Sequence, residues 1–230
     1  MPIQGLSEPA QQIIEKFSAL ESIKGYQLVG GTALSITLNH RKSEDLDFCQ
    51  WVPDARNVKY GIDEKKIHSE LTSFFGRVES NHLDFYQVNF YIEEPGVKIT
   101  FYHTDLKRPT EQAKLLIGNI EVAALEVLGG SKIYVTTRRL EIRDYYDIYV
   151  LIDQKYLAFD NMLKRAYVFS REANPKRIQH QFAKVNFTEE NFNELQRLKP
   201  TCPLKDVKTL NDFFKGLSEN LNLKKSNGIR

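Results

Sequence analysis

The sequence contains few cysteines and lacks any long apolar run. Cys49 and Cys202 are its two cysteines, and neither lies in a CxxC pair or a Cys/His cluster. This excludes a zinc framework and indicates free thiols in a reducing compartment. No stretch approaches the roughly 18 apolar residues of a membrane span, and the first residues lack the basic start and apolar core of a signal peptide. We therefore expect a cytoplasmic protein with no membrane partner.

What the sequence does contain is an ordinary globular composition with an uneven distribution of charge. Of its 230 residues, 41% are hydrophobic and 27% charged, enough for one large domain or two small ones. Residues 1–106 carry ten Lys/Arg against fifteen Asp/Glu, whereas residues 107–230 carry twenty-two against fifteen. An acidic part could hold cations and a basic part phosphates. Ordinary variation between two solvated surfaces explains the asymmetry equally well.

Hydrophobic periodicity and turn residues predict an α+β chain. Strands are expected at 26–29 and 45–51, followed by a hairpin of 83–92 and 97–104 around a Glu-Glu-Pro-Gly turn. Helices are expected at 8–20, 32–38, 63–75, 111–129 and 131–152, with Gly129-Gly130 as a break between the last two. Residues 155–230 also have helical spacings. We predict an α/β domain over 1–106 and a helical domain over 107–230.

A double glycine separates the first predicted strand from the helix that follows it. Gly30 and Gly31 allow a positive φ and the close approach of a ligand to the backbone. The free N–H groups and the positive dipole end of the helix would favour phosphate at the same place. Taken alone the signal is weak, because most such turns bind nothing.

Asp45 and Asp47 occupy alternate positions in an otherwise apolar strand, so their carboxylates point to the same side. Two such carboxylates repel each other unless a cation lies between them, and hard oxygen ligands suit Mg²⁺, which also accepts phosphate oxygens. A polar strand face left in water is the alternative. Because Leu46, Phe48 and Trp51 indicate a central strand, we favour the metal site.

A second group of charged residues occurs in "SKIYVTTRRLEIRDYYDIYVLI", residues 131–152. In one continuous helix, Arg139 would be the i,i+4 neighbour of Arg143, and Arg143 that of Asp147, while Asp144 and Asp147 would share a face. Two interpretations of this segment are equally consistent with its sequence: a surface helix with weak ion pairs, and a buried network of charged residues.

The string "GGTALSITLNHRKSEDLDF" resembles the AbiEii/AbiGii-type toxins of type IV toxin–antitoxin pairs. These are abortive-infection proteins of the polymerase-beta-like nucleotidyltransferase superfamily. Their pattern is GGTAL, a spacer, then Arg-x-Ser-x-Asp-hydrophobic-Asp-hydrophobic, and it recurs here. Lys132, Arg139 and the "RDYYD" string are similar to the family's second motif. The resemblance covers roughly residues 26–152.

The resemblance implies a polymerase-beta-type nucleotidyltransferase fold, a small mixed sheet with helices, followed by a mostly helical C-terminal half. It implies catalytic residues Asp45, Asp47, Lys132 and Asp147, of which Asp45 and Asp47 would bind Mg²⁺ or Mn²⁺. Lys132 would contact nucleotide phosphates, and Asp147 or Asp144 would act as base or orient Lys132. The nucleotide-binding residues that it implies are Gly30, Gly31, Thr32, Arg41, Ser43, Lys132, Arg139, Arg143 and Asp144.

One position departs from the superfamily pattern. A third carboxylate usually follows on a later strand in a Lys-hydrophobic-Asp-hydrophobic string. The matching stretch here is "VKITF", with Thr100 in place of the aspartate. Asp84 and Asp105 are possible substitutes, although neither has the expected neighbours.

The function implied is transfer of a nucleoside monophosphate from an NTP to an acceptor hydroxyl, by resemblance the 3′ end of a tRNA. The partners implied are an NTP, an RNA acceptor and a cognate antitoxin. Two alternatives are a nucleotide-binding or partner-binding protein that has lost catalysis, which Thr100 favours, and a phosphotransferase that uses the same pocket.

Overall fold

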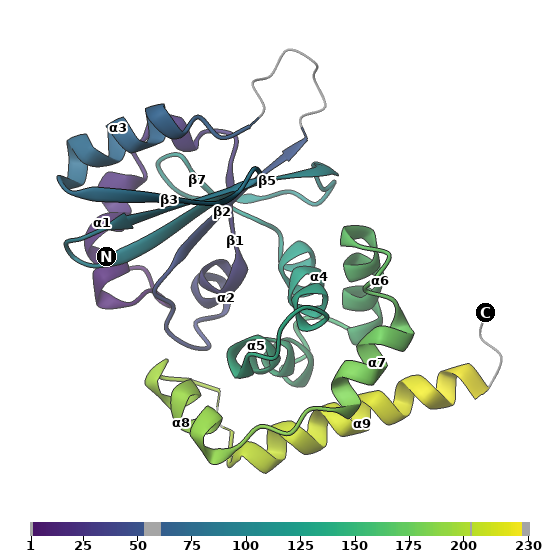
Figure 1. Ribbon diagram of the computed structural model, residues 1–230. Coiled ribbons are helices and arrows are strands. Elements are labelled where there is room, and N and C mark those ends of the chain that lie inside the picture. Colours follow the sequence, from purple (N-terminus) through teal and green to yellow (C-terminus); the bar gives the residue numbers. More distant parts are fainter. Residues whose placement is uncertain (1, 53–60, 203, 227–230) are drawn as a thin grey trace. The chain divides into compact units, whose positions relative to one another are not determined.

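The computed structural model describes residues 2–52, 61–202 and 204–226 (Figure 1). The chain divides into two compact units, Met1–Leu125 and Glu126–Arg230, whereas the predicted division lies between residues 106 and 107. Each unit has its own core and is described separately. Within the described segments, none of the helices combines the length and the hydropathy needed to cross a lipid bilayer.

The first unit is built on a seven-stranded mixed sheet with the order β3-β4-β5-β2-β1-β7-β6. The strands are β1 (Gln27–Val29), β2 (Leu46–Val52), β3 (Val78–Asp84), β4 (Gln87–Ile92), β5 (Val97–Lys107), β6 (Lys114–Ile117) and β7 (Ile120–Val122). β2 is central, as predicted. It pairs antiparallel with β1 and parallel with β5.

The two faces of this sheet differ because successive residues of β2 point to opposite sides, Leu46 and Phe48 to one side and Asp47 to the other. Leu46 and Phe48 are fully buried on one face. There the ring of Phe17, from α1 (Glu8–Phe17), lies 5.2 Å from that of Phe48. α3 (Glu64–Phe75) covers the same face, and α2 (Gly30–Leu38) lies on the opposite side of the sheet (Figure 1). Asp45 and Asp47 therefore project away from the aromatic core.

The predicted helix over 111–129 is wrong except at its end, because β6 and β7 lie within that range and only residues 125–129 are helical, as the start of α4. Residues rich in Ala, Leu and Glu favour helix only weakly, and tertiary pairing overrides such a preference. β7 adds to the sheet parallel to β1, with Leu28 opposite Val122. The tight turn before β7 is fixed by Asn119, whose main-chain N–H donates to the Ser18 carbonyl at 2.7 Å.

The predicted strand over 83–92 is also only partly right. β3 ends at Asp84 and β4 begins at Gln87, so a two-residue turn interrupts it. The main-chain N–H of Tyr86 donates to the Asp84 carboxylate at 2.7 Å, which fixes that turn. β3 itself is mostly exposed and polar, so it carries no apolar alternation that would predict it.

The second unit is helical, as predicted. Its helices are α4 (Leu125–Thr136), α5 (Ile142–Asp153), α6 (Phe159–Phe169), α7 (Pro175–Ala183), α8 (Glu189–Arg197) and α9 (Val207–Ser226). Tyr145 of α5 lies at the centre of an aromatic core, with ring centroids 4.8 Å from Phe214 and 6.0 Å from Phe182.

The break predicted at Gly129-Gly130 lies elsewhere. Both glycines are inside α4, and the chain leaves the helix after Thr136. The hydroxyls of Thr136 and Thr137 donate to the carbonyls three residues earlier, both at 2.7 Å. Such local hydrogen bonds compete with the helical ladder. Lys132 and Asp144 are consequently on different helices, and Arg139 lies in the connection between them.

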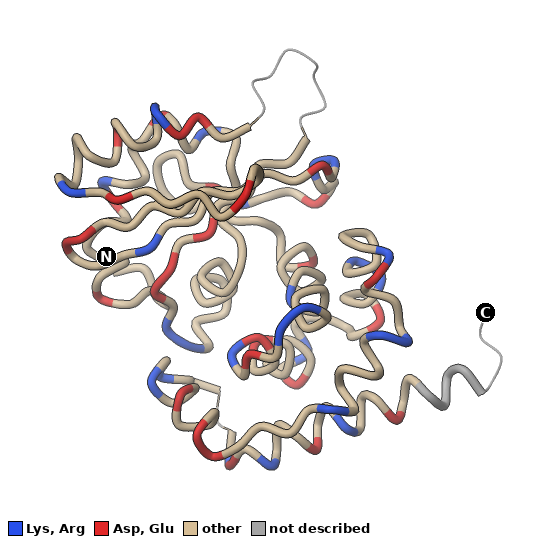
Figure 2. The backbone as a smooth tube through the Cα atoms, in the orientation of Figure 1, with Lys and Arg blue, Asp and Glu red and all other residues tan. Residues whose placement is uncertain are grey.

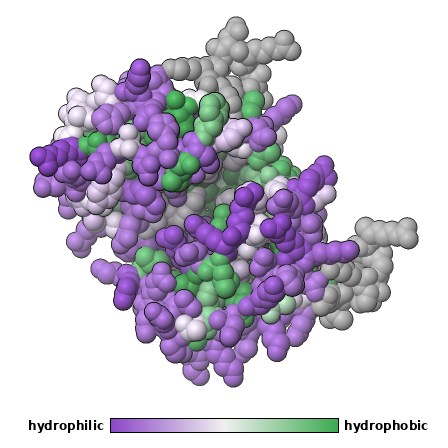
Figure 3. All heavy atoms as spheres, viewed as in Figure 1, coloured by the Kyte–Doolittle hydropathy of each residue, from purple (hydrophilic) through white to green (hydrophobic). Residues whose placement is uncertain are grey.

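Both signs of charge are interspersed along the helices of the second unit (Figure 2). On the face of the molecule shown in Figure 3, hydrophilic side chains predominate and hydrophobic ones form small groups among them. Cys49 is buried and Cys202 half-buried, and both are free thiols, as predicted. Burial raises the pKa of Cys49 to about 12, which keeps this thiol protonated and unreactive near neutral pH.

Candidate nucleotide and metal site

The glycine turn and Asp47 form one structural unit. β1 ends at Val29 and α2 begins at Gly30 without a connecting loop. Gly30 has a φ of +70°, and a Cβ atom at this position would lie 2.7 Å from Oδ2 of Asp47. The absent side chain thus makes room for the carboxylate. Because the first N–H groups of a helix have no partner within it, this carboxylate lies beside a place that suits phosphate oxygens.

Asp45 lies on the same face of the sheet, immediately before β2. Its Oδ2 forms an ion pair of 2.8 Å with Nζ of Lys98, and the two side chains are 36% and 44% exposed. Lys98 comes from β5, which runs parallel to β2 with Leu46 opposite Ile99. Asp45 is therefore accessible to solvent and already has a cationic neighbour.

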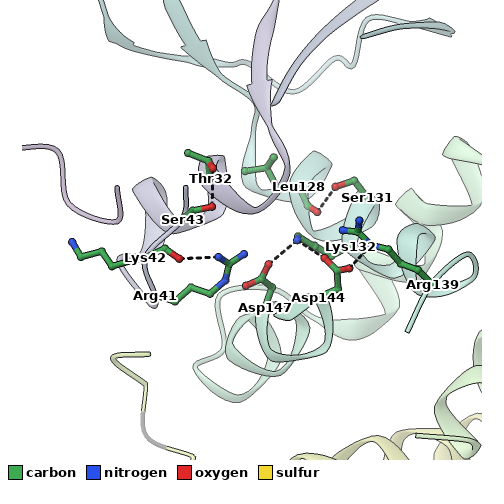
Figure 4. A network of polar contacts seen from close by, with 10 residues as sticks. All are labelled: Thr32, Arg41, Lys42, Ser43, Leu128, Ser131, Lys132, Arg139, Asp144 and Asp147. Carbon is green, nitrogen blue, oxygen red and sulfur yellow. Dashed lines mark hydrogen bonds and ion pairs between the residues drawn. The ribbon is translucent and has the colours of Figure 1, made fainter. Parts of the chain in front are cut away.

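The loop between α2 and β2 is held by buried hydroxyl groups (Figure 4). The Thr32 hydroxyl donates to the main-chain carbonyl of Asp45 and is also hydrogen-bonded to the Ser43 hydroxyl at 2.8 Å. The Ser43 main-chain N–H donates to the Gly5 carbonyl at 2.9 Å. The structure thus brings Thr32 and Ser43 together as supports for Asp45.

Arg41 lies in the same loop and is buried. Its guanidinium donates to the main-chain carbonyl of Lys42 at 3.0 Å (Figure 4). This contact ties the arginine to the backbone of its own loop. Binding of nucleotide by Arg41, Thr32, Ser43 and the two glycines stays a prediction.

Thr100 lies beside Asp47 in the sheet. The two residues are register partners on β5 and β2, and Thr100 is buried. Neither possible substitute reaches this place. Asp84 is on β3, with β4 and β5 between it and β2, and Asp105 lies five residues beyond Thr100 on β5, roughly 16 Å along the strand.

In the second unit, Lys132 of α4 lies between two carboxylates of α5. Its Nζ is 2.7 Å from Oδ1 of Asp144 and 2.7 Å from Oδ2 of Asp147 (Figure 4). All three side chains are buried. Asp144 and Asp147 thus share one face of α5, as predicted, and the network is the buried alternative rather than a set of surface ion pairs.

Arg139 completes this network from the connection between α4 and α5. Its Nε donates to Oδ2 of Asp144 at 2.8 Å. The prediction that Arg139 is the i,i+4 helical neighbour of Arg143 is wrong, because Arg139 precedes α5. Arg143 is half-buried on α5.

The pKa of Asp144 reflects two opposing effects. Burial raises it, but the charges and hydrogen bonds of Lys132 and Arg139 outweigh burial and hold the pKa below the ordinary value. Asp144 is therefore ionised at neutral pH, and its charge is compensated inside the unit.

The sequence matches a family of known proteins over most of its length. Residues 15–215 match the family described as nucleotidyl transferase AbiEii toxin, type IV toxin–antitoxin system. The chain belongs to the AbiEii nucleotidyltransferase toxin family. The resemblance drawn from the two motifs is thereby confirmed, and the family extends further along the chain than those motifs do. No curated protein matches the sequence.

Solved structures share the fold of this AbiEii family member at low sequence identity. MenT4, the nucleotidyltransferase toxin Rv2826c of Mycobacterium tuberculosis H37Rv, is 15% identical with a TM-score of 0.53, covering 93% of this chain and 84% of that one. A candidate nucleotidyltransferase from H. pylori is 16% identical with a TM-score of 0.53, covering 95% and 96%. JHP933 from Helicobacter pylori is 17% identical with a TM-score of 0.49, covering 96% and 99%. The chain thus shares its fold with MenT4 and with the H. pylori nucleotidyltransferase.

The residues of the AbiEii chain that could hold a metal are Asp45 and Asp47. Among the residues that the structure describes, no group of three or more His, Cys, Asp or Glu side chains could hold a metal ion. Two carboxylates nevertheless suit Mg²⁺, which is commonly bound by one or two carboxylates together with substrate phosphates and water. The space at Gly30 that admits the Asp47 carboxylate also fits such a site.

Lys98 is the residue of this site that the sequence did not reveal. The string "VKITF" places it two residues before Thr100, so both side chains are on one face of β5. Its contact with Asp45 depends on the parallel pairing of β2 with β5, two strands separated by more than forty residues. Local periodicity carries no information about such a pairing.

Proposed function

We propose that this chain transfers a nucleoside monophosphate from an NTP to an acceptor hydroxyl of RNA, at the 3′ end of a tRNA. The observation that carries the proposal is the position of Asp47 against Gly30. It supports a metal ligand directly beside the helix N-terminus that suits phosphate. Asp45 and Asp47 would hold Mg²⁺ or Mn²⁺. When bound, the ion supplies Lewis-acid stabilisation of charge that develops on the phosphoryl oxygens.

The reaction is an in-line displacement. The acceptor oxygen forms a bond with the α-phosphorus, and the bond from that phosphorus to the α,β-bridging oxygen breaks. Pyrophosphate leaves with the electron pair of that bond, and the hydroxyl proton passes to solvent water. The N–H groups at the start of α2 would orient the β- and γ-phosphates. The buried hydrogen bonds of Thr32 hold the Asp45 backbone in place, which fixes the angle of approach.

Lys132 would contact the nucleotide phosphates, and Asp144 and Asp147 would orient it. Their 2.7 Å contacts with Nζ support this orienting role over that of a base for Asp147, because both carboxylates already accept from the ammonium. Arg139 and Arg143 would add positive charge for phosphate or acceptor. Binding of the RNA backbone by such residues would weaken as salt rises.

The test uses NTPs labelled at the α-phosphorus, total RNA and Mg²⁺. Wild-type protein should label RNA of tRNA size, and labelling should disappear when periodate has destroyed the 3′ diol. Asp45→Asn and Asp47→Asn should each lower the rate at least about 100-fold, the loss typical of removing one transition-state stabilising group.

Asp105→Asn is the matched control, because Asp105 lies on the same sheet away from Asp47, and its rate should equal that of the wild type. Circular dichroism should show that each variant is folded. Undiminished labelling by Asp45→Asn or Asp47→Asn would remove the carboxylate pair from the mechanism. Label transferred from the γ-phosphorus instead would identify a phosphotransferase.

A second candidate is a nucleotide-binding protein without turnover, which the neutral Thr100 beside Asp47 favours. In that case NTP should bind, and no label should reach any RNA.

A cognate antitoxin is the further partner we propose, because the family is described as the toxin of a type IV toxin–antitoxin system. Growth arrest by the wild type but not by Asp47→Asn, relieved by coexpressing the neighbouring gene, would identify it.

The role of Lys132 is tested by binding. Lys132→Met should weaken NTP affinity at least about tenfold in calorimetry, since it removes a charge-assisted phosphate contact, while Mg²⁺ affinity without nucleotide should stay the same. Lys184→Met, at an exposed lysine of the same unit, is the control. Unchanged NTP affinity in folded Lys132→Met would take Lys132 out of the nucleotide site.

A further inference from the structure

The ion pair of Lys98 with Asp45 changes the charge of the carboxylate site. Lys98 and Thr100 are alternate residues of β5, and β5 lies directly beside β2. Lys98 places an ammonium 2.8 Å from the Asp45 carboxylate. Thr100 places a neutral hydroxyl beside Asp47. Lys98 matches the lysine of the superfamily string, so Thr100 alone makes the site less negative, by one charge, than the three-carboxylate pattern.

The number of divalent cations that such a site can hold follows from its charge and its ligands. Three carboxylates with the lysine of the superfamily string carry a formal charge of −2, whereas Asp45, Asp47 and Lys98 together carry −1. Two divalent ions side by side repel each other four times as strongly as two unit charges, so they need bridging anionic ligands. Thr100 cannot supply the negative charge that an aspartate would.

An ammonium can take the place of one metal ion where the requirement is fixed positive charge. Lysine is a compact point charge on a flexible stem, and the side chain of Lys98 is accessible to solvent as well as to Asp45. A plain surface ion pair is the simpler explanation of the contact, since exposed pairs often have little effect. The two explanations differ in what happens when Lys98 loses its charge.

We propose that Asp45 and Asp47 hold a single divalent cation and that Lys98 supplies the second positive charge of the site. Lys98 orients Asp45 and lowers the negative charge on the carboxylate pair. This rests on the proposed nucleotidyl transfer for its effect on rate, but the number of ions can be counted without any turnover.

The experiment counts bound Mn²⁺ by electron paramagnetic resonance on the full chain, with and without a mixture of the four α,β-methylene NTP analogues. The wild type should bind one ion per chain. Lys98→Met should also bind one, about tenfold more tightly without nucleotide because the competing ammonium is gone. Its transfer rate should fall about 100-fold. Lys98→Arg keeps the charge and should retain wild-type Mn²⁺ affinity.

Two further variants complete the design. Lys107→Met, at an exposed lysine of the same strand, should match the wild type in every measurement. Thr100→Asp restores the missing carboxylate and should bind a second ion in the presence of the analogues. If the Thr100→Asp variant is folded but binds a single Mn²⁺ ion, residue 100 does not determine how many ions the site holds.

Two ions on the wild type, or none, would overturn the proposal. Lys98→Met with the Mn²⁺ affinity and transfer rate of Lys107→Met would show a surface ion pair only. Tighter Mn²⁺ binding by Lys98→Met with an unchanged rate would reduce Lys98 to a competitor for the carboxylate, which also overturns it. If no chain transfers nucleotide but the counts and affinities are as expected, the proposed function fails and the single-ion assignment stands.

Discussion

At the scale of single residues, the site depends on one missing side chain. Gly30 was singled out in the sequence for its freedom to adopt a positive φ, and the structure gives the second reason for a glycine there. The Asp47 carboxylate occupies the space that a Cβ atom would take. Alternation within one strand was enough to predict that Asp45 and Asp47 share a face. The approach of Asp47 to residue 30 depends on the pairing of β1 with β2, which the sequence does not state.

Gly30→Ala should therefore have two effects. The positive φ strains any L side chain and the Cβ displaces the carboxylate, so we expect the free energy of unfolding to fall by about 2–4 kcal/mol. Mn²⁺ affinity should fall with it, because Asp47 moves. Urea unfolding and Mn²⁺ titration measure the two effects.

Gly76→Ala separates strain from displacement. Gly76 also has a positive φ, but nothing lies within 4 Å of the Cβ position. Its substitution should cost only about 1–2 kcal/mol of backbone strain and leave Mn²⁺ binding unchanged. Equal stability losses and unchanged Mn²⁺ binding in both variants would mean that residue 30 does not position Asp47.

At the scale of elements, the sequence predicted helices and strands well where one face is regularly apolar. α1, α2, α3 and β2 lie within a few residues of their predicted ranges. The misses share a cause. The segment that contains β6 and β7 was predicted to be helical, but it forms strands that complete the sheet beside β1. The double glycine was predicted to end a helix, but it lies inside α4. The pairing of β7 with β1 and the packing of α4 against α6 decided these structures.

The double glycine in α4 has a packing role. A Cβ at Gly130 would lie 2.6 Å from Cβ of Arg165 and 3.2 Å from the Ala166 nitrogen, both on α6. Gly130→Ala should lower the free energy of unfolding by about 1–3 kcal/mol through overpacking, although alanine favours helix. Gly216→Ala in α9 has nothing within 4 Å of the new Cβ and should raise it by about 0.5–1 kcal/mol. Thermal melts compare them, and a stabilised Gly130→Ala would refute close α4–α6 packing.

At the scale of the whole molecule, the sequence indicated an α+β part followed by a helical part, and the fold agrees. The compact units meet at residue 125 rather than 106 because β6 and β7 belong to the sheet. Both units contain a pair of aspartates, in different surroundings. Asp45 and Asp47 are half-exposed, whereas Asp144 and Asp147 are buried and form ion pairs with Lys132.

Because of the buried network, the free energy of unfolding of the second unit should fall at acidic pH. Asp144 has a folded-state pKa below its unfolded value of about 3.9. Its ion pairs therefore stabilise the fold fully above that pH, and this contribution is lost as the pH falls through the folded pKa. Asp144→Asn should cost about 3–5 kcal/mol at pH 7, the usual effect of breaking a buried pair. The difference from wild type in urea unfolding should narrow as the pH falls below about 4.

The matched control is Glu172→Gln, which breaks the exposed ion pair with Arg177 in the same unit. Exposed pairs contribute about 0–1 kcal/mol, so this variant should stay close to wild type from pH 7 downwards. A difference between Asp144→Asn and wild type that is as large at pH 2.5 as at pH 7 would mean that the charge of Asp144 is not what stabilises the fold. The buried carboxylate would then act through its shape and packing, and the reasoning that assigns it to orienting Lys132 by charge would fail with it.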